Sequence, residues 1–325
     1  MCAFSLIRSL AELQSRLVPS GGRVAIRLSA GEQHMGEKIG LIGLGLLGSA
    51  LAERLAAAGF TVIGHDTDAA RYDALKVLGV ERADSPREVA ERAKRIVLSL
   101  PNSPVVESVV EGKDGIVCGA ASGTVIVDAT TADPVRSARL AERLRGRGIA
   151  FVDATISGSS RQAREGKAVI MVGGDEAVVN RQRDIFAAVS PKVFFMGPVG
   201  KGAETKLLVN LVLGLNRLAL AEGLAMGIRA GVEPERLLEV LKAGAAYSQV
   251  MDAKGAKMIA GGGAPEARLA QHLKDVRLIL EMGERTGARL PVSALHARLL
   301  QEAVALGFGE QDNSAIINVF VPRGE

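Results

Sequence analysis

The sequence predicts an α/β protein with a doubly wound parallel sheet covered by helices, followed by an all-α C-terminal domain. From residue 38 to about residue 199, short apolar runs alternate with longer segments of helical periodicity, which is the pattern of parallel strands joined by helices. After residue 200 the strand-like runs stop and only helical periodicity continues. The chain has 325 residues, which suits two domains better than one core.

These periodicities give the elements in order. The expected strands span residues 38–42, 61–64, 95–100, 124–128, 149–153, 168–172 and 192–196. The expected helices of the first part span residues 49–58, 71–78, 104–110, 134–145 and 177–189. Those of the second part span residues 203–230, 234–243, 248–258, 269–285 and 292–306. We therefore expect a sheet domain over residues 37–199 and an all-helical domain over residues 200–325.

Residues 1–36 form an N-terminal extension that we expect to lie outside the fold. This segment has several Arg and Ser, few acidic residues and some amphipathic periodicity, a composition that resembles a transit peptide. The alternative is an upstream start site, because the sequence from Met35 onward already has the form of a complete N-terminus for the sheet domain. We favour the second interpretation.

Composition excludes several classes of protein. Hydrophobic residues make up 48% of the chain and charged residues 23%, so the protein can bury a core and is expected to be globular. Aromatic residues are only 3% and Trp is absent, which leaves no platform for stacking nucleic-acid bases. The net charge is +4, and residues 1–38 contribute five Lys or Arg against three Asp or Glu, so the body is close to neutral. Nucleic acid is therefore not an expected partner.

The cysteines and histidines give no sign of a disulfide framework or a metal site. The two cysteines, Cys2 and Cys118, fit a reducing compartment, so a cytoplasmic location is expected. The four histidines are scattered, without the spacing that would place two ligands on one helix face.

Residues 207–230 are apolar enough to suggest a transmembrane helix. Polar and charged residues nevertheless interrupt this segment, namely Asn210, Asn216, Arg217, Glu222 and Arg229. Charges near the centre of a membrane span are costly. We therefore expect a long buried helix between the domains and no membrane partner.

A GxGxxG motif follows the first expected strand and precedes the first expected helix. Gly43 permits a tight turn, Gly45 lets the backbone approach a pyrophosphate, and Gly48 allows close packing of helix against strand. Asp66, at the end of the next strand, can accept a hydrogen bond from a ribose 2′-hydroxyl. The motif predicts a Rossmann-type dinucleotide-binding domain. The predicted cofactor-binding loop consists of Gly43, Leu44, Gly45, Leu46, Leu47 and Gly48.

The choice of cofactor depends on Asp66. Its negative charge would repel the additional phosphate of NADP, and no Arg stands at the next position, Thr67. Arg71 lies close enough in sequence to reach a phosphate. NAD is therefore favoured over NADP.

Two further strands should end at the same sheet edge, where ligands bind in open α/β sheets, so the residues at these strand ends are expected to line the same crevice. They are Leu100, Pro101 and Asn102 after one strand, and Thr130 and Thr131 after the next. Each group can equally be a turn with a helix cap, because Ser, Thr, Asn and Pro commonly have that role.

Two polar segments are candidates for the chemistry. Residues 152–160 include Ser157, Gly158 and Ser159, which form a loop that could hold a carboxylate or be a plain serine-rich connection. Lys206 and Asn210 are four residues apart on an otherwise apolar helix and so share one face. Burial would depress the pKa of Lys206 toward the range useful for proton transfer, whereas snorkelling from the start of the helix is the alternative.

Four ordered motifs make the chain similar to the β-hydroxyacid dehydrogenase family, which includes 3-hydroxyisobutyrate dehydrogenase and tartronate semialdehyde reductase. They are GLGLLG at residues 43–48, DATISG at 153–158, GKGAETKLLVN at 200–210 and HLKDVRL at 272–278. The resemblance implies a Rossmann-type domain joined to a helical domain, with the active site in a cleft between them.

The same resemblance implies a role for each matching residue. Lys206 would be the catalytic acid/base, and Asn210 with the Ser157–Gly158 loop would hold the substrate. Thr131 would lie on the cofactor, and Lys274 would lie near the nicotinamide. The implied function is NAD(P)-dependent interconversion of a small 3-hydroxy acid and its semialdehyde or oxo acid, of the 3-hydroxyisobutyrate or 2-hydroxy-3-oxopropionate class.

The chain departs from the family pattern near the substrate loop. Ser159 and Gln162 stand where the family has glycines, Val209 replaces the first of two asparagines, and Arg161 and Arg164 are unusual neighbours. As a hypothesis, the added hydroxyl and amide groups favour a hydroxylated acid such as D-glycerate over a branched aliphatic one.

Two alternatives to this enzyme remain open. An imine reductase on the same scaffold would generally lack the lysine at position 206. A non-catalytic dinucleotide-binding module would have no need of Lys206 and Asn210 together. Whichever function applies, the apolar helical domain predicts packing against another subunit, as a homodimer or homotetramer.

Overall fold

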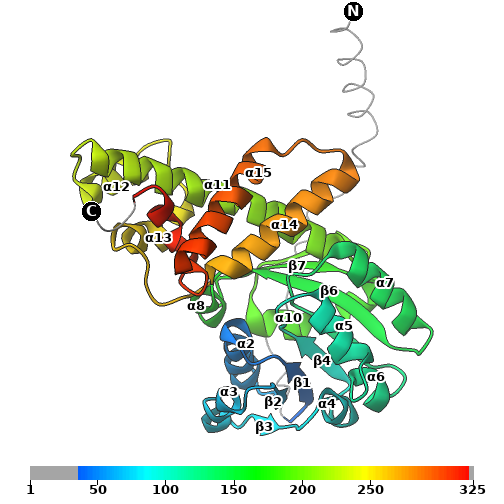
Figure 1. Ribbon diagram of the computed structural model, residues 1–325. Coiled ribbons are helices and arrows are strands. Elements are labelled where there is room, and N and C mark those ends of the chain that lie inside the picture. Colours follow the sequence, from blue (N-terminus) through cyan, green and yellow to red (C-terminus); the bar gives the residue numbers. More distant parts are fainter. Residues whose placement is uncertain (1–35, 322–325) are drawn as a thin grey trace, which may run out of the picture.

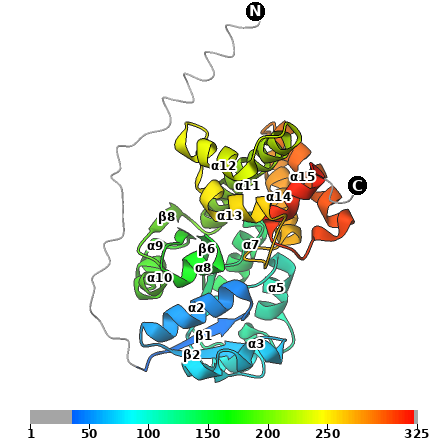
Figure 2. The ribbon, with the colours of Figure 1, turned by 90° about the vertical axis from the view of Figure 1, so that its left-hand side faces the viewer.

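The computed structural model describes residues 36–321, so the predictions for residues 1–36 lie outside the described residues except for Gly36. Within this range a sheet with its covering helices is followed by a group of helices (Figure 1). Turning the molecule by 90° shows the helical group lying on one side of the sheet part (Figure 2).

The sheet has eight strands in the order β3-β2-β1-β4-β5-β6-β7-β8. Their bounds are β1 Lys38–Ile42, β2 Thr61–His65, β3 Glu81–Arg82, β4 Arg95–Leu98, β5 Val125–Asp128, β6 Ala150–Ser157, β7 Val169–Gly173 and β8 Val193–Gly197. The order changes direction between β1 and β4, which is the doubly wound arrangement that the sequence predicts.

The expectation of a fully parallel sheet is wrong at one pair of strands. β6 and β7 are antiparallel, with Asp153 opposite Gly173 and Ser157 opposite Val169. Only the short helix α8 (Ser160–Arg164) lies between these strands, and a parallel return requires a longer crossover. The pairing also extends β6 to Ser157, past the predicted end at residue 153.

Helices cover both faces of the sheet, over two separate apolar clusters. They are α2 Leu46–Ala57, α3 Ala69–Asp73, α4 Pro86–Arg92, α5 Ser103–Glu111, α6 Ile116–Gly119, α7 Pro134–Arg145, α8, α9 Glu176–Asn180 and α10 Arg183–Val189. The helix expected over residues 71–78 is α3 followed by a 3-10 turn at Lys76–Leu78, and that expected over 177–189 is divided into α9 and α10.

Three short helices, α4, α6 and α8, were not predicted because they hold only one or two turns and show little periodicity. For α4 the local signal exists, since the Ser85 side chain accepts a hydrogen bond from Glu88 N and Pro86 occupies the first turn. For α8 a reciprocal cap is present between Ser159 and Gln162.

The second part contains helices with one shared apolar core. They are α11 Lys201–Arg229, α12 Pro234–Ala243, α13 Gln249–Ile259, α14 Leu269–Thr286 and α15 Pro291–Ala303, followed by the π-helical turn η2 Val304–Phe308 and the 3-10 segment η3 Asn313–Val319. The expected last helix, 292–306, ends earlier because Gly307 has a φ of 89° and breaks the helical conformation.

Among the described helices, α11 is the one long and apolar enough to cross a membrane by length and composition. It packs against β6 and β7 at its start and against α13, α14 and η3 further on. Its buried side chains include Lys206, Asn210 and Arg217, so polar groups of this helix face protein. The helix therefore lies between the two parts as the sequence predicts, but the expectation of a buried helix holds for one of its faces only.

The opposite face of α11 is an exposed apolar stripe. We use the name α11 stripe for Leu208, Val212, Ala219, Gly223 and Met226, which recur at three-, four- and seven-residue spacing and therefore share one face. Leu208, Val212 and Met226 are 52%, 57% and 75% exposed. Ala219 and Gly223 would allow a second helix to approach closely.

We expect the α11 stripe to be covered by a second copy of the chain, so the protein should sediment as a dimer or tetramer. Val212→Lys would place an ammonium group in the stripe and shift the equilibrium toward monomer, as measured by analytical ultracentrifugation. Val77, which is 88% exposed in the sheet part, provides the control Val77→Lys, which should change nothing. A wild-type protein that is monomeric at every concentration would contradict this prediction.

Candidate active site

The loop between β1 and α2 has the shape of a phosphate cradle. A Cβ atom at Gly43, whose φ is 92°, would lie 2.2 Å from the Ser99 carbonyl oxygen, and one at Gly48 would lie 1.9 Å from the Gly43 carbonyl oxygen. At Gly45 the nearest atom to an added Cβ is Arg71 Nη1 at 3.6 Å. Gly43 and Gly48 are therefore required for packing, whereas the missing side chain of Gly45 leaves space beside the start of α2. This geometry fits a dinucleotide pyrophosphate.

The three leucines of the predicted cofactor loop have different environments. Leu44 is buried in the sheet core, and its backbone N–H donates a hydrogen bond of 2.7 Å to Asp66 Oδ2. Leu46 is 44% exposed and Leu47 is half-buried at the start of α2. Backbone groups, and not the Leu44 side chain, are thus available to a cofactor at this loop.

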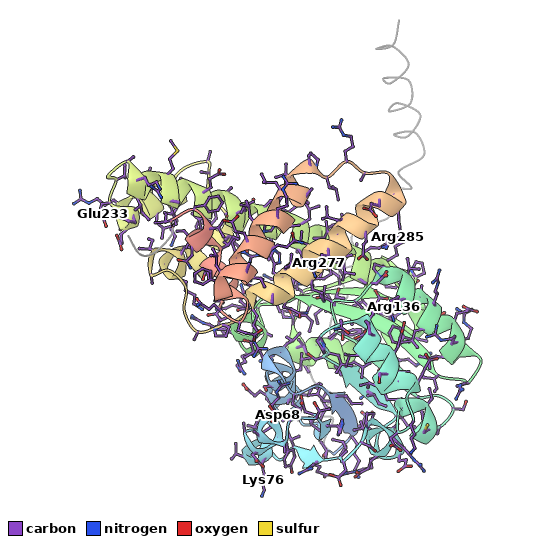
Figure 3. The ribbon with its side chains drawn as sticks, in the orientation of Figure 1. Asp68, Lys76, Arg136, Glu233, Arg277 and Arg285 are labelled. Carbon is purple, nitrogen blue, oxygen red and sulfur yellow. The ribbon has the colours of Figure 1, made fainter. Side chains whose placement is uncertain are left out.

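Asp66 stands directly after β2 and points back to the loop. Burial raises the pKa of its carboxyl, but hydrogen bonds from the Asp68 and Leu44 N–H groups and the charge of Arg71 outweigh burial, so the pKa lies below its usual value. Arg71 Nη1 lies 3.2 Å from Asp66 Oδ2, and Arg71 Nε lies 3.3 Å from Asp68 Oδ2. The carboxylates of Asp66 and Asp68 therefore hold the Arg71 guanidinium near Gly45. Asp68 is labelled in Figure 3.

The carboxyl ends of β4 and β5 carry the second predicted group. Leu100 N donates to Thr130 Oγ1 at 3.1 Å, which joins the two strand ends. Asn102 Oδ1 accepts from Val105 N at 3.0 Å and caps α5, so its side chain has the capping role that was the alternative interpretation. Pro101 and Thr131 offer backbone carbonyls at this edge.

Helix α14 is fastened to the same edge of the sheet. Lys274 Nζ donates to the Thr131 carbonyl at 2.6 Å and to the Pro101 carbonyl at 3.2 Å, and Gln271 Nε2 donates to the Pro101 carbonyl at 2.9 Å. Toward the other end of α14, Arg285, which is labelled in Figure 3, lies 3.7 Å from Asp133, and Asp133 caps α7. The structure thus brings Lys274 to Thr131 and Pro101, while Gln271 is a contact that the sequence analysis missed.

The start of α11 is anchored on β6. Asp153 Oδ1 accepts from Gly200 N at 2.8 Å, and its Oδ2 accepts from Ala203 N at 2.7 Å. Thr155 Oγ1, two residues further along the same face of β6, donates to the Gly202 carbonyl at 3.0 Å. Burial raises the pKa of Asp153 to about 7 although these hydrogen bonds oppose it. These contacts fix the turn of α11 that precedes Lys206.

Lys206 is 7% exposed and lies on the protein-facing side of α11. Within residues 36–321 no hydrogen bond or ion pair reaches its amine. Burial lowers the pKa of Lys206 to about 8; the negative charge of Asp275 opposes this shift, and the positive charge of Lys274 adds to it. The prediction of a buried lysine with a depressed pKa is therefore met in this structure, and snorkelling is not observed.

Asn210, one turn after Lys206, is 6% exposed and donates from Nδ2 to Asp275 Oδ2 at 2.9 Å. Asp275 Oδ1 lies 2.9 Å from Lys274 Nζ, an ion pair without hydrogen-bond geometry. Asp275 therefore joins two predicted site residues on different helices. The sequence alone does not show this connection, because a carboxylate next to a lysine on a helix is usually a surface pair.

The predicted substrate loop is shorter than expected. Ser157 is the last residue of β6, on the same face as Asp153 and Thr155, and so points toward α11. Gly158 follows with a φ of 143°, a conformation that side chains rarely adopt. No contact between this segment and Lys206 is within hydrogen-bond distance in the described structure.

Ser159 and Gln162 are engaged with each other. The Ser159 hydroxyl accepts from Gln162 N at 3.2 Å, while Gln162 Oε1 accepts from Ser159 N at 2.8 Å. This reciprocal cap explains the two departures from the family glycines as a device that starts α8. The Ser159 hydroxyl oxygen and Gln162 Oε1 thus accept from backbone N–H groups, and the hypothesis that these side chains favour a hydroxylated acid stays a prediction.

Over the described range, residues 36–321, no group of three or more His, Cys, Asp or Glu side chains is arranged to hold a metal ion.

Comparison with known proteins agrees with this arrangement. Residues 38–197 match the model of the NAD-binding domain of 6-phosphogluconate dehydrogenase, and residues 200–320 match the NAD-binding model of NADP-dependent 3-hydroxyisobutyrate dehydrogenase. With the glycine cradle and the carboxylate after β2, these matches define the class of the protein as an NAD(P)-binding oxidoreductase.

Similar proteins define the family within this class. The chain is 35% identical to 2-(hydroxymethyl)glutarate dehydrogenase of Eubacterium barkeri, over 87% of this chain and 94% of that protein. It is 33% identical to 2-hydroxy-3-oxopropionate reductase of Escherichia coli, over 86% and 96%. The chain belongs to the β-hydroxyacid dehydrogenase family, which confirms the resemblance seen in its motifs.

A solved structure supports the fold. The crystal structure of 3-hydroxyisobutyrate dehydrogenase from Salmonella typhimurium superposes with a TM-score of 0.81 at 24% identity, and covers 87% of this chain and 99% of that one. The Rossmann-type sheet with an all-helical C-terminal region is therefore confirmed as the fold class.

The contrast between the loop glycines can be tested. Gly45→Ala should fold normally, because the added methyl meets no atom closer than 3.6 Å, yet it should weaken NADH binding about tenfold or more by filling the phosphate cradle. Gly48→Ala should instead lower the melting temperature, since its Cβ would clash with backbone. Thermal unfolding and NADH fluorescence titration measure the two effects. Equal NADH affinity in wild type and Gly45→Ala would refute the assignment of the cradle.

Proposed function

We propose that the protein is a dehydrogenase that interconverts a small 3-hydroxy acid and its semialdehyde or oxo acid, with Lys206 as the general acid/base. The observation that carries this proposal is the buried, unpaired Lys206 amine, whose pKa is lowered to about 8 by burial. A group with such a pKa can take and return a proton near neutral pH. Both relatives compared above are named for small hydroxy acids or their oxidised forms.

The cofactor supplies one chemical function when bound, which is to accept or return a hydride at its nicotinamide ring. In the oxidation direction the neutral Lys206 amine takes the proton of the substrate hydroxyl, while the hydride leaves the carbon that bears this hydroxyl. In the reduction direction the ammonium returns that proton to the carbonyl oxygen. The proton and the hydride together account for the two hydrogens removed from the alcohol.

Other residues of the chain would position the substrate. Ser157 and the backbone at Gly158 end β6 on the side that faces α11, and they would bind the substrate carboxylate. Asn210 would orient the reacting oxygen next to Lys206. Lys274 and Thr131, which already contact one another, would border the nicotinamide.

We further propose NAD as the preferred cofactor. The Asp66 carboxylate is favoured in its charged form by two backbone N–H groups and can accept from a ribose hydroxyl. Arg71 is held by both Asp66 and Asp68, so a 2′-phosphate would have to compete with two carboxylates for the guanidinium.

A substrate panel with both cofactors tests the proposed activity through Lys206. Oxidation requires the neutral amine, so kcat/KM should rise with pH through a midpoint of about 8, whereas reduction should fall over the same range. Lys206→Met should lower kcat by about 10² to 10⁴-fold, and NADH affinity should be kept. The same substitution should abolish the rise of kcat/KM with pH, which is the acidic limb of the pH profile for oxidation. Lys201→Met, at the exposed start of the same helix, is the control. Full activity in Lys206→Met would refute the proposed role.

The cofactor preference can be tested at two neighbouring carboxylates. Asp66→Asn should lower kcat/KM for NAD by about tenfold and raise the NADP-to-NAD ratio, because a charge-assisted hydrogen bond is lost and a repulsive charge is removed. Asp68→Asn, which also removes a charge next to Arg71, should change the ratio far less. A wild type that prefers NADP, or equal effects of both substitutions, would count against Asp66 as the determinant.

A further inference from the structure

We propose that Asp275 is a positioning residue for the reaction: it holds the Asn210 amide in one orientation and supplies the counter-charge to the Lys206 ammonium. This inference rests on the proposed function, because it assigns a purpose to Asp275 through Lys206 and Asn210. Asp275 is 7% exposed and lies on α14, facing α11.

Asp275 fixes the orientation of the Asn210 amide. An asparagine amide offers donors on Nδ2 and acceptor sites on Oδ1, and rotation by half a turn exchanges them. Ionised carboxylates accept hydrogen bonds and do not donate them. Asp275 Oδ2, 2.9 Å from Asn210 Nδ2, therefore selects the orientation with the amide nitrogen toward α14. The Oδ1 atom of Asn210 remains as an acceptor for the substrate hydroxyl or the Lys206 ammonium.

Asp275 also affects the balance of charge around Lys206. From α14, Lys274, Asp275 and His272 all interact with Lys206. The His272 imidazole is neutral, because burial and the positive charge of Arg217 lower its pKa well below the usual value. From α11 itself, Arg217 interacts with Asp275. Asp275 thus forms an ion pair with Lys274 at 2.9 Å, and its negative charge also acts on Lys206 and Arg217.

Other charged groups packed against α11 are occupied elsewhere. Asp312, before η3, forms an ion pair with Lys254 of α13 at 2.8 Å. Asp153 of β6 binds the backbone of the first turn of α11. His296 of α15 packs against Gly214, and burial lowers its pKa to about 4, so it is neutral. Asp275 is therefore the carboxylate whose negative charge opposes the lowering of the Lys206 pKa.

Asp275 is also connected, through Lys274, to the sheet edge where we expect the cofactor to bind. Asp275 Oδ1 pairs with Lys274, and Lys274 donates to the carbonyls of Thr131 and Pro101 at the ends of β5 and β4. One carboxylate therefore contacts both the helix with the proton-transfer group and the lysine that fastens α14 to the sheet. A surface ion pair between neighbouring residues would make no such connection.

Two substitutions separate the two roles. Asp275→Asn removes the charge but keeps an oxygen that can accept from Asn210 Nδ2. It should move the acidic limb of kcat/KM for alcohol oxidation about one pH unit lower and leave kcat above the limb within about threefold. Asp275→Leu removes the acceptor as well, and it should lower kcat about tenfold or more at every pH, with NADH affinity retained.

Two controls make the result specific. Glu284→Gln removes an exposed carboxylate from the same helix and should leave the limb in place. In an Asn210→Ala background, Asp275→Leu should add less than about twofold to the loss, because the amide that it orients is already absent. A limb that stays at the wild-type pH in Asp275→Asn, or fully additive losses in the double variant, would overturn the inference.

The inference and the proposed function fail in different ways. If the limb persists in Lys206→Met, the limb does not belong to that amine, and the proposed function and this inference are both overturned. If Lys206→Met abolishes the limb but Asp275→Asn leaves it unmoved, the proposed function stands and only the role of Asp275 is rejected.

Discussion

The geometry of the site depends on the anchorage of α11 to β6 by a buried carboxylate. Asp153 binds the backbone at Gly200 and Ala203, and Thr155 binds the backbone at Gly202. These contacts allow little space: a Cβ at Gly202 would lie 2.8 Å from Asp153 Oδ2. These hydrogen bonds hold β6 directly against the start of α11. Ser157, further along β6, and Lys206, further along α11, therefore lie on facing elements. The antiparallel strand β7 lies next to β6, and α11 packs against both strands.

The sheet part could be predicted because its signals are local. Each apolar run of four or five residues corresponds to a strand, and the GxGxxG loop with Asp66 has a geometry determined by backbone sterics. The direction of β7 could not be predicted, since strand periodicity is the same in parallel and antiparallel pairs. Short helices such as α6 also escaped, because a single turn carries no amphipathic period.

The site could be predicted in part. Lys206 and Asn210 were identifiable because polar residues on an apolar helix face are unusual. Asp275 and Gln271 were not identifiable, because their roles come from contacts with residues more than 60 positions away in the chain. Asn102 and Ser159 show the opposite case: their polar side chains satisfy the backbone at helix starts, and sequence alone does not distinguish this use from binding.

The reciprocal cap between Ser159 and Gln162 has a consequence for ligand affinity. A glycine-rich segment after Ser157 would sample many conformations and would lose that freedom when a ligand arrives. Here the segment is already restricted by two hydrogen bonds and by the first turn of α8. The entropy of ordering is therefore lost during folding, so the segment that we propose to bind the substrate carboxylate is ordered before any ligand arrives. The same rigidity narrows the range of ligand shapes that the segment can accept.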